Sequence, residues 1–204
     1  MDEFPEFDRS VIEALRQPLE DRTITISRAR GAVTFPAQCI FLASMNPCPC
    51  GRGGERGCLC PQHVLEAYRR KISGPITDRL DIWLNVHKID YEKMTEKISS
   101  GEDSSTIRNR VIKARTIQSD RYKKFNINKS YNGEMNASDI EKLINLDDVA
   151  KKTIRSSAEK MELSGRSFHR ILKVAQTISD LGNRDIITEP DILEALQYRR
   201  KMTD

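Results

Sequence analysis

Apolar side chains in the second half of the chain recur every three or four residues, between strongly charged stretches. The clearest stripe consists of Phe168, Ile171, Leu172, Ala175 and Ile178, whose spacing places all five on one face of a helix. Similar periodicity predicts helices over residues 90–98, 105–125, 137–143, 147–160, 167–181 and 189–199. This part of the chain is therefore expected to form a helical bundle with the stripe in its core.

The first 88 residues follow a different pattern. A helical period begins after Asp8, which suits an N-cap, and a short helix is expected over residues 63–72. Residues 23–26 and 32–35 alternate around the tip 27–31, which predicts a β-hairpin.

Two apolar runs in the same part, residues 39–45 and 81–86, are predicted to be strands. The first, CIFLASM, is continuous, as expected of a fully buried strand, with Cys39 as a packed core thiol. So few strands cannot form a stable sheet alone, because their edges would stay unpaired. We predict the back half of an α/β domain over residues 1–88, followed by an all-α domain over residues 89–204.

The composition permits a nucleic-acid partner without requiring one. The net charge is +4, and 31% of the residues are charged. No apolar run approaches the roughly 20 residues of a membrane span, and the acidic start MDEFPEFDRS is unlike a signal peptide. We therefore expect a cytoplasmic protein with reduced cysteines. Closely spaced cysteines are then better explained as metal ligands than as disulfides.

Four of the five cysteines, Cys48, Cys50, Cys58 and Cys60, follow the pattern Cys-x-Cys-x₇-Cys-x-Cys. Four thiolates match the tetrahedral coordination of Zn²⁺, and the glycines between the pairs let the chain fold back. His63 could replace one cysteine. The alternatives are four unmetallated thiols or a knuckle that keeps its fold without metal. A bound zinc would be structural, because four protein ligands leave no position for water.

The pair Asp2-Glu3 and the later Asn46 suit nucleotide hydrolysis. A P-loop ATPase needs an acidic residue for Mg²⁺, a carboxylate that orients the attacking water, and a polar residue on the neighbouring strand. Taken alone, such an acidic pair is more often solvated charge, and asparagine before proline is more often a turn residue. Their order along the chain, with a helix, a hairpin and an apolar strand between them, favours the functional interpretation.

Three blocks, ASMNPCPCG, SGPITDRLDI and ELSGRSFHRILKVAQTISDL, carry a resemblance to a known family. With MDEFPEF they make essentially the whole chain similar to the magnesium chelatase-like AAA+ ATPases of the ComM/YifB type. The resemblance implies part of an AAA+ P-loop core, lacking the Walker A half, followed by a helical lid. It also implies ATP and Mg²⁺ as cofactors, a ring of identical subunits (a hexamer) and DNA as a partner.

In the first part of the chain, the resemblance implies three roles. Asp2 would be the Walker B partner of Mg²⁺. Glu3 would polarise the hydrolytic water. Asn46 would be sensor one, the polar residue that helps to place that water.

Three arginines complete the site that the resemblance implies. Arg79 would be the arginine finger that reaches the γ-phosphate of a neighbouring subunit, where a planar cation suits the spread charge of the transition state. The alternative for Arg79 is an ion pair with Asp78 or Asp81. Arg166 would be sensor two, and Arg170, four residues along the same helix face, is the other candidate.

No GxxxxGK[ST] motif occurs in the chain, so the lysine and the amides that cradle phosphate in this family are missing. We expect the chain to be a fragment of a longer ATPase, a truncated reading frame or a deliberate piece. Alone it should be inactive and should not bind ATP tightly.

The hairpin tip carries Arg28 and Arg30, in the place of a hairpin that points into the central pore of related ring helicases. Two arginines there could bind DNA phosphates without reading bases, and the alternative is a solvated turn. Arg52 and Arg56 would widen the same basic surface. The basic helix over 105–125 is better explained as a solvated face.

Three functions remain open at this point. The first is a ring-forming ATPase that couples hydrolysis to DNA remodelling or translocation, like a branch-migration helicase. The second is a chelatase-type motor that remodels a partner protein. The third is a non-catalytic, zinc-stabilised interaction module.

Overall fold

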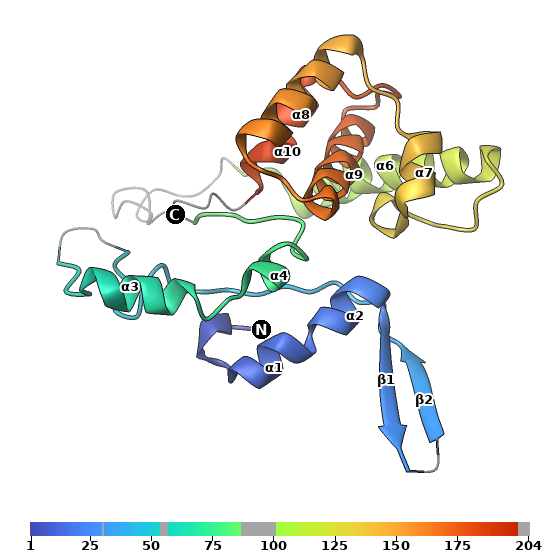
Figure 1. Cartoon of the computed structure of the whole chain (residues 1–204). Helices are drawn as coiled ribbons and strands as arrows, with labels where there is room; N and C mark the ends of the chain where they lie inside the picture. The colour runs from blue at the N-terminus through green and yellow to red at the C-terminus, as the bar shows by residue number, and fades with distance from the viewer. Residues whose placement is uncertain (30, 54–56, 87–100, 200–204) are drawn as a thin grey trace. The chain divides into compact units, whose positions relative to one another are not determined.

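The computed structural model describes residues 1–29, 31–53, 57–86 and 101–199, in two compact units, Met1–Leu80 and Asp81–Asp204 (Figure 1). Arg30, Arg56 and the helix expected over 90–98 lie outside the described residues. The structure agrees with the predicted class, a small part with helices and strands followed by a helical domain. No helix in the described ranges has the length and apolarity needed to cross a membrane.

The first unit holds short elements around a small core. They are η1 (Phe4–Glu6), α1 (Arg9–Ala14), α2 (Arg16–Asp21), β1 (Thr23–Arg28), β2 (Gly31–Pro36), α3 (Gln62–Arg69) and α4 (Gly74–Thr77). Asp8 is the N-cap of α1, as expected. The buried side chains of this unit include Phe4, Ile12, Cys48, Tyr68, Ile72 and Ile76.

The predicted hairpin is confirmed as the antiparallel pair β1–β2, which projects from α2 as a ribbon (Figure 1). Its register pairs Ile24 with Phe35 and Ile26 with Val33, so these four apolar side chains share one face. The other face is polar, and the hydroxyls of Thr25 and Thr34 lie 3.1 Å apart. The hairpin is therefore amphipathic, and its apolar side chains remain partly exposed.

The prediction of a buried strand over residues 39–45 is wrong for the described structure. The segment is extended but joins no named strand, and Ile40 and Leu42 are 93% and 81% exposed. Cys39 is likewise exposed, not a core thiol. Among the described residues of Met1–Leu80, residues 1–4 are the backbone partner of this segment. Phe41 packs on Phe4, whereas Ile40 and Leu42 on the other face stay uncovered. Residues 81–86, also predicted as a strand, join none either.

The second unit is helical, and its helices begin and end close to the predicted bounds. They are α6 (Ser104–Lys124), η2 (Asn132–Glu134), α7 (Ala137–Leu143), α8 (Asp148–Lys160), α9 (Gly165–Leu181) and α10 (Glu189–Gln197). The expected stripe of α9 is in the core: Ile171, Leu172 and Ala175 are buried, with Phe168 and Ile178 packed against them. Helix α9 contacts α6, α7 and α10.

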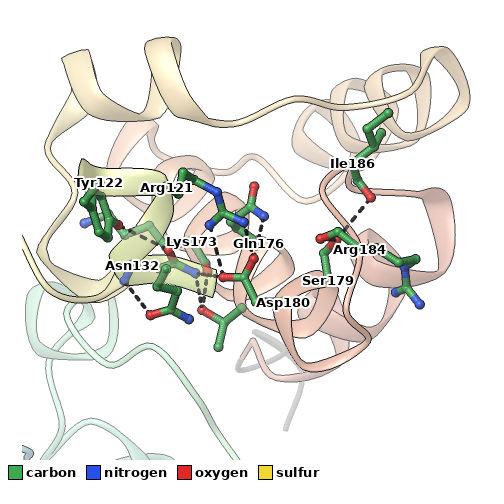
Figure 2. A network of polar contacts seen from close by, with 11 residues as sticks. Arg121, Tyr122, Asn132, Lys173, Gln176, Ser179, Asp180, Arg184 and Ile186 are labelled. Carbon is green, nitrogen blue, oxygen red and sulfur yellow. Dashed lines mark hydrogen bonds and ion pairs between the residues drawn. The ribbon is translucent and has the colours of Figure 1, made fainter. Parts of the chain in front are cut away.

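A polar network fixes α9 against α6 and η2 (Figure 2). The Asp180 carboxylate pairs with the Arg121 guanidinium and accepts hydrogen bonds from the Asn132 amide at 2.7 Å and the Gln176 amide at 3.1 Å. The Tyr122 hydroxyl donates to Asn132 at 3.2 Å. Because a buried charge is costly unless it is paired and hydrogen-bonded, this arrangement specifies how the three elements pack.

Candidate functional site

The acidic start of the chain runs parallel to the extended segment that ends at Asn46. The Met1 amine donates to the Leu42 carbonyl at 2.7 Å. The Ser44 amide donates to the Met1 carbonyl at 2.9 Å, and the Phe4 amide donates to the Ser44 carbonyl at 2.8 Å. The structure therefore brings the Asp2-Glu3 pair beside the segment of the candidate sensor, although Asp2 and Ser44 are 42 residues apart in sequence.

Ser44 contacts a candidate site residue, and the sequence reasoning missed this contact. Its hydroxyl donates a hydrogen bond to the Asp2 carboxylate. Asn46 lies two residues after Ser44 on the same segment. The alternation of Ser44 and Asn46 within ASMNP could have indicated this pairing.

Asp2 is an exposed and readily ionised carboxylate. The Ser44 hydroxyl and then the Glu3 backbone N–H, which donates at 3.0 Å, lower the pKa of Asp2. Both donors favour the charged form, which is the form that binds a hard cation such as Mg²⁺.

Glu3 lies in the left-handed region, with φ of 49°, which is uncommon for a residue other than glycine. Phe4, the next residue, is buried and packs edge-on against Phe41, with 5.5 Å between ring centroids. The packing of Phe4 thus holds the acidic pair in place. Left-handed backbone conformations of residues other than glycine are enriched at functional sites.

Arg79 is held inside its own unit. Its side chain is 13% exposed and its Nε lies 3.4 Å from a Glu20 carboxylate oxygen. It donates to the Pro75 carbonyl at 2.7 Å and the Arg16 carbonyl at 3.2 Å. An ion pair was the expected alternative to an arginine finger, and the structure contains one, with Glu20.

Arg166 and Arg170 lie in the first two turns of α9, which Ser164 caps by accepting a hydrogen bond from the Ser167 amide at 3.2 Å. Arg166 is exposed. The Arg170 side chain is 14% exposed and pairs with the Asp81 carboxylate. These arginines belong to the second unit, and the acidic pair, Asn46 and Arg79 to the first.

The four predicted cysteine ligands form one cluster. Their sulfur atoms lie within 4.8 Å of one another, and Cys48 Sγ lies 3.3 Å from Cys50 Sγ and 3.9 Å from Cys58 Sγ. Zn–S bonds of about 2.3 Å in a tetrahedron imply sulfur separations of about 3.8 Å, so the donor set fits Zn²⁺. His63 is not part of the cluster.

Glycines allow the loop to close around the cluster. Gly51, Gly53 and Gly57 have φ of 77°, 61° and 88°, which side chains other than glycine rarely adopt. A Cβ on Gly53 would lie 2.9 Å from the Pro47 ring, whereas one on Gly51 would meet nothing.

The thiols of the cluster do not share one pKa. Burial raises the pKa of Cys48, but the Gly53 N–H, at 3.0 Å from Sγ, and a hydrogen bond with Cys50 outweigh it and lower the pKa to about 6. Thiol hydrogen bonds, first that with Cys50, raise the pKa of Cys60 to about 12. Clustered thiols cannot all ionise easily without a cation, and a bound metal would supply that charge.

Two family models match the chain. The model described as "Magnesium chelatase, subunit ChlI" matches residues 1–94, and "Magnesium chelatase, subunit ChlI C-terminal" matches residues 101–199. The chain belongs to the magnesium chelatase-like AAA+ family.

Curated relatives in this family match nearly the whole chain. It is 38% identical to competence protein ComM of Haemophilus influenzae, over 98% of this chain and 38% of ComM. It is 34% identical to YifB of Escherichia coli, over 98% of this chain and 38% of YifB. The chain thus spans about two fifths of the length of these relatives.

Proposed function

We propose that this chain contributes the Walker B, sensor and lid elements of an ATP-hydrolysing AAA+ motor that remodels DNA. The observation that carries the proposal is the parallel pairing of residues 1–4 with residues 42–44. Because of this pairing, the exposed and ionised Asp2 lies beside the segment that leads to Asn46. Nucleotide hydrolysis requires an acidic residue and a polar residue on such neighbouring segments.

In this proposal, Asp2 holds Mg²⁺, which when bound neutralises charge on the phosphates. Glu3 accepts a hydrogen bond from the attacking water and orients it, and Asn46 fixes the same water from the neighbouring segment. Arg166, the more exposed of the two candidate arginines, contacts the nucleotide from the lid.

Arg79 is proposed to act on the nucleotide of a neighbouring subunit in a ring, a hexamer in this family. Its contacts with Glu20 and two carbonyls hold it within its own unit. Its use as a finger therefore requires these contacts to be exchanged for phosphate when subunits assemble.

Exchanging this chain for the matching 38% of ComM from H. influenzae gives a full-length protein in which hydrolysis can be measured. We expect Glu3→Gln to lower kcat by about 100-fold or more, and Glu6→Gln, in the 3₁₀ helix that directly follows Glu3, to leave it unchanged. Equal activity of the two variants would contradict the role of Glu3. Stimulation of the ATPase by DNA supports a DNA motor, and its absence from an active exchange protein favours a chelatase-type motor.

The hairpin β1–β2 is proposed to contact DNA through Arg28, which is exposed at the end of β1, together with Arg30. Each arginine that neutralises a phosphate contributes about 0.9 to the slope of log K against log salt. Replacing both by alanine should reduce that slope by about two, whereas Arg155→Ala, at an exposed position of α8, should leave it unchanged. An unchanged slope in the double variant would refute the hairpin contact.

We also propose that Cys48, Cys50, Cys58 and Cys60 bind one structural Zn²⁺. Elemental analysis should find stoichiometric zinc in the chain and in Cys39→Ser, whose thiol lies outside the cluster. Cys60→Ser should lose it. Absence of zinc from the unaltered chain, with no thiolate-to-metal absorption after adding Co²⁺, would exclude the site.

A further inference from the structure

The second unit begins with a short segment that is attached to the lid at two points. The Asp81 carboxylate pairs with the guanidinium of Arg170 on α9. Two residues later, the Trp83 amide donates to the Tyr198 carbonyl at 2.8 Å, directly after α10. Residues 81–83 are therefore held against both α9 and the end of α10.

The residues just before this segment are fixed equally well in the first unit. Arg79 is bonded to the Pro75 and Arg16 carbonyls and to Glu20. The boundary between the two units falls after Leu80. Only Leu80 separates the anchored side chain of Arg79 from the anchored side chain of Asp81.

We propose that Asp81 is a positioning residue: its ion pair with Arg170 anchors the lid helix α9 to the segment that carries Arg79. A movement of α9 is then passed from Asp81 to Arg79 through the backbone of Leu80. This inference rests on the proposed function, in which Arg166 contacts phosphate, and it assigns Arg170 to the anchor.

The chemistry of the pair suits a contact that transmits motion. Arg170 is 14% exposed and fixed on a helix, whereas Asp81 is 53% exposed on an extended segment. An ion pair that is open to solvent on one side contributes little stability and weakens with salt. The attachment can therefore be loosened without unfolding the lid, and ionic strength should control it.

The chain contains its own reporter of this attachment. Trp83 is the single tryptophan, and it lies two residues from Asp81 within the attached segment. Detachment would expose its indole and break its amide hydrogen bond to Tyr198. The fluorescence and the amide exchange of Trp83 therefore measure the anchor without any nucleotide.

The test compares Asp81→Asn with the unaltered 204-residue chain. We expect a red shift of the emission, a larger acrylamide quenching constant and faster amide exchange at Trp83, while the helical melting curve stays unchanged. Asp185→Asn, an exposed acid of the same unit, should match the unaltered chain. The charge exchange Asp81→Arg with Arg170→Asp should restore the original quenching.

Changing the ionic strength provides a second test of the same ion pair. Raising the ionic strength from about 0.1 M to about 1 M shortens the Debye length from about 10 Å to about 3 Å. The quenching constant should rise in the unaltered chain and stay constant in Asp81→Asn. If Asp81→Asn leaves the fluorescence and exchange of Trp83 unchanged, the anchor is refuted, whatever hydrolysis measurements show.

Discussion

At the scale of single residues, Asp180 shows how the lid obtains a unique packing. Its side chain has no exposed surface, and three side chains from α6, η2 and α9 satisfy its carboxylate. An acid near the end of a helix, such as Asp180 in α9, gives no sign in the sequence of which distant arginine will pair with it. Only the fold brings Arg121 to it.

Removing this carboxylate should be costly. We expect Asp180→Ala to destabilise the helical unit by about 3–5 kcal/mol, because the Arg121 charge would stay largely buried without a partner. Asp185→Ala, an exposed control five residues along the chain, should stay within about 0.5 kcal/mol. Urea unfolding followed by circular dichroism measures both, and equal midpoints would contradict the argument.

Asp139 should make lid stability depend on pH. Burial raises its pKa, but hydrogen bonds from Lys129 and from the Asn136 amide outweigh burial, so that the folded pKa lies below 3.8. A depressed folded pKa contributes stability above the unfolded pKa, and this stability is lost as the pH falls through the folded pKa.

The predicted outcome is that Asp139→Asn is less stable than the unaltered chain at pH 6 and that the difference shrinks below about pH 4. Urea unfolding across pH 2–7 gives the two curves. Parallel curves over the whole range would show that Asp139 carries no such linkage.

At the scale of elements, the sequence predicted the helices better than the strands. The signals that define a helix, its capping residues and its apolar periodicity, lie within or next to the helix itself. The bounds of α7 and the end of α8 therefore fall where the sequence predicted them. The hairpin was equally predictable, because its two strands are adjacent in sequence. The segment 39–45 was not, since strand formation depends on partners that local pattern cannot supply.

In the candidate site, too, local features could be predicted from the sequence and long-range contacts could not. The cysteine cluster was predictable because its ligands lie within one loop. The contacts of Ser44 with Asp2 and of Glu20 with Arg79 were missed, because they join residues that are far apart in sequence.

The loop around the cysteine cluster allows a matched comparison of two glycines. Gly51→Ala and Gly53→Ala both place a side chain at positive φ, at a cost of about 1–2 kcal/mol. Only Gly53→Ala also meets Pro47. We expect both to weaken Zn²⁺ binding in chelator competition and Gly53→Ala to weaken it more; the reverse order would contradict the loop geometry.

At the scale of the whole molecule, the chain consists of two units with separate buried clusters. The cysteine cluster lies in Met1–Leu80, and the large apolar core lies in the second unit. A structural metal stabilises only the part that folds around it. The units are therefore expected to respond separately to metal removal.

Calorimetry with and without a chelator tests this expectation. The transition of the first unit should move to lower temperature when the metal is removed, and that of the helical unit should stay in place. Cys60→Ser should reproduce the chelated curve and Cys39→Ser the untreated one. A shift of both transitions together would show that the units unfold as one.

The segment 39–45 should also affect the tendency of the chain to self-associate in solution. Ile40 and Leu42 stand almost fully in solvent on an extended backbone, and an open, apolar strand edge is a template for pairing with other chains. Concentrated samples should therefore self-associate through this edge and elute early and unevenly on gel filtration. The assays above are therefore best carried out at low protein concentration. Self-association through the exposed segment is then not mistaken for assembly into a ring.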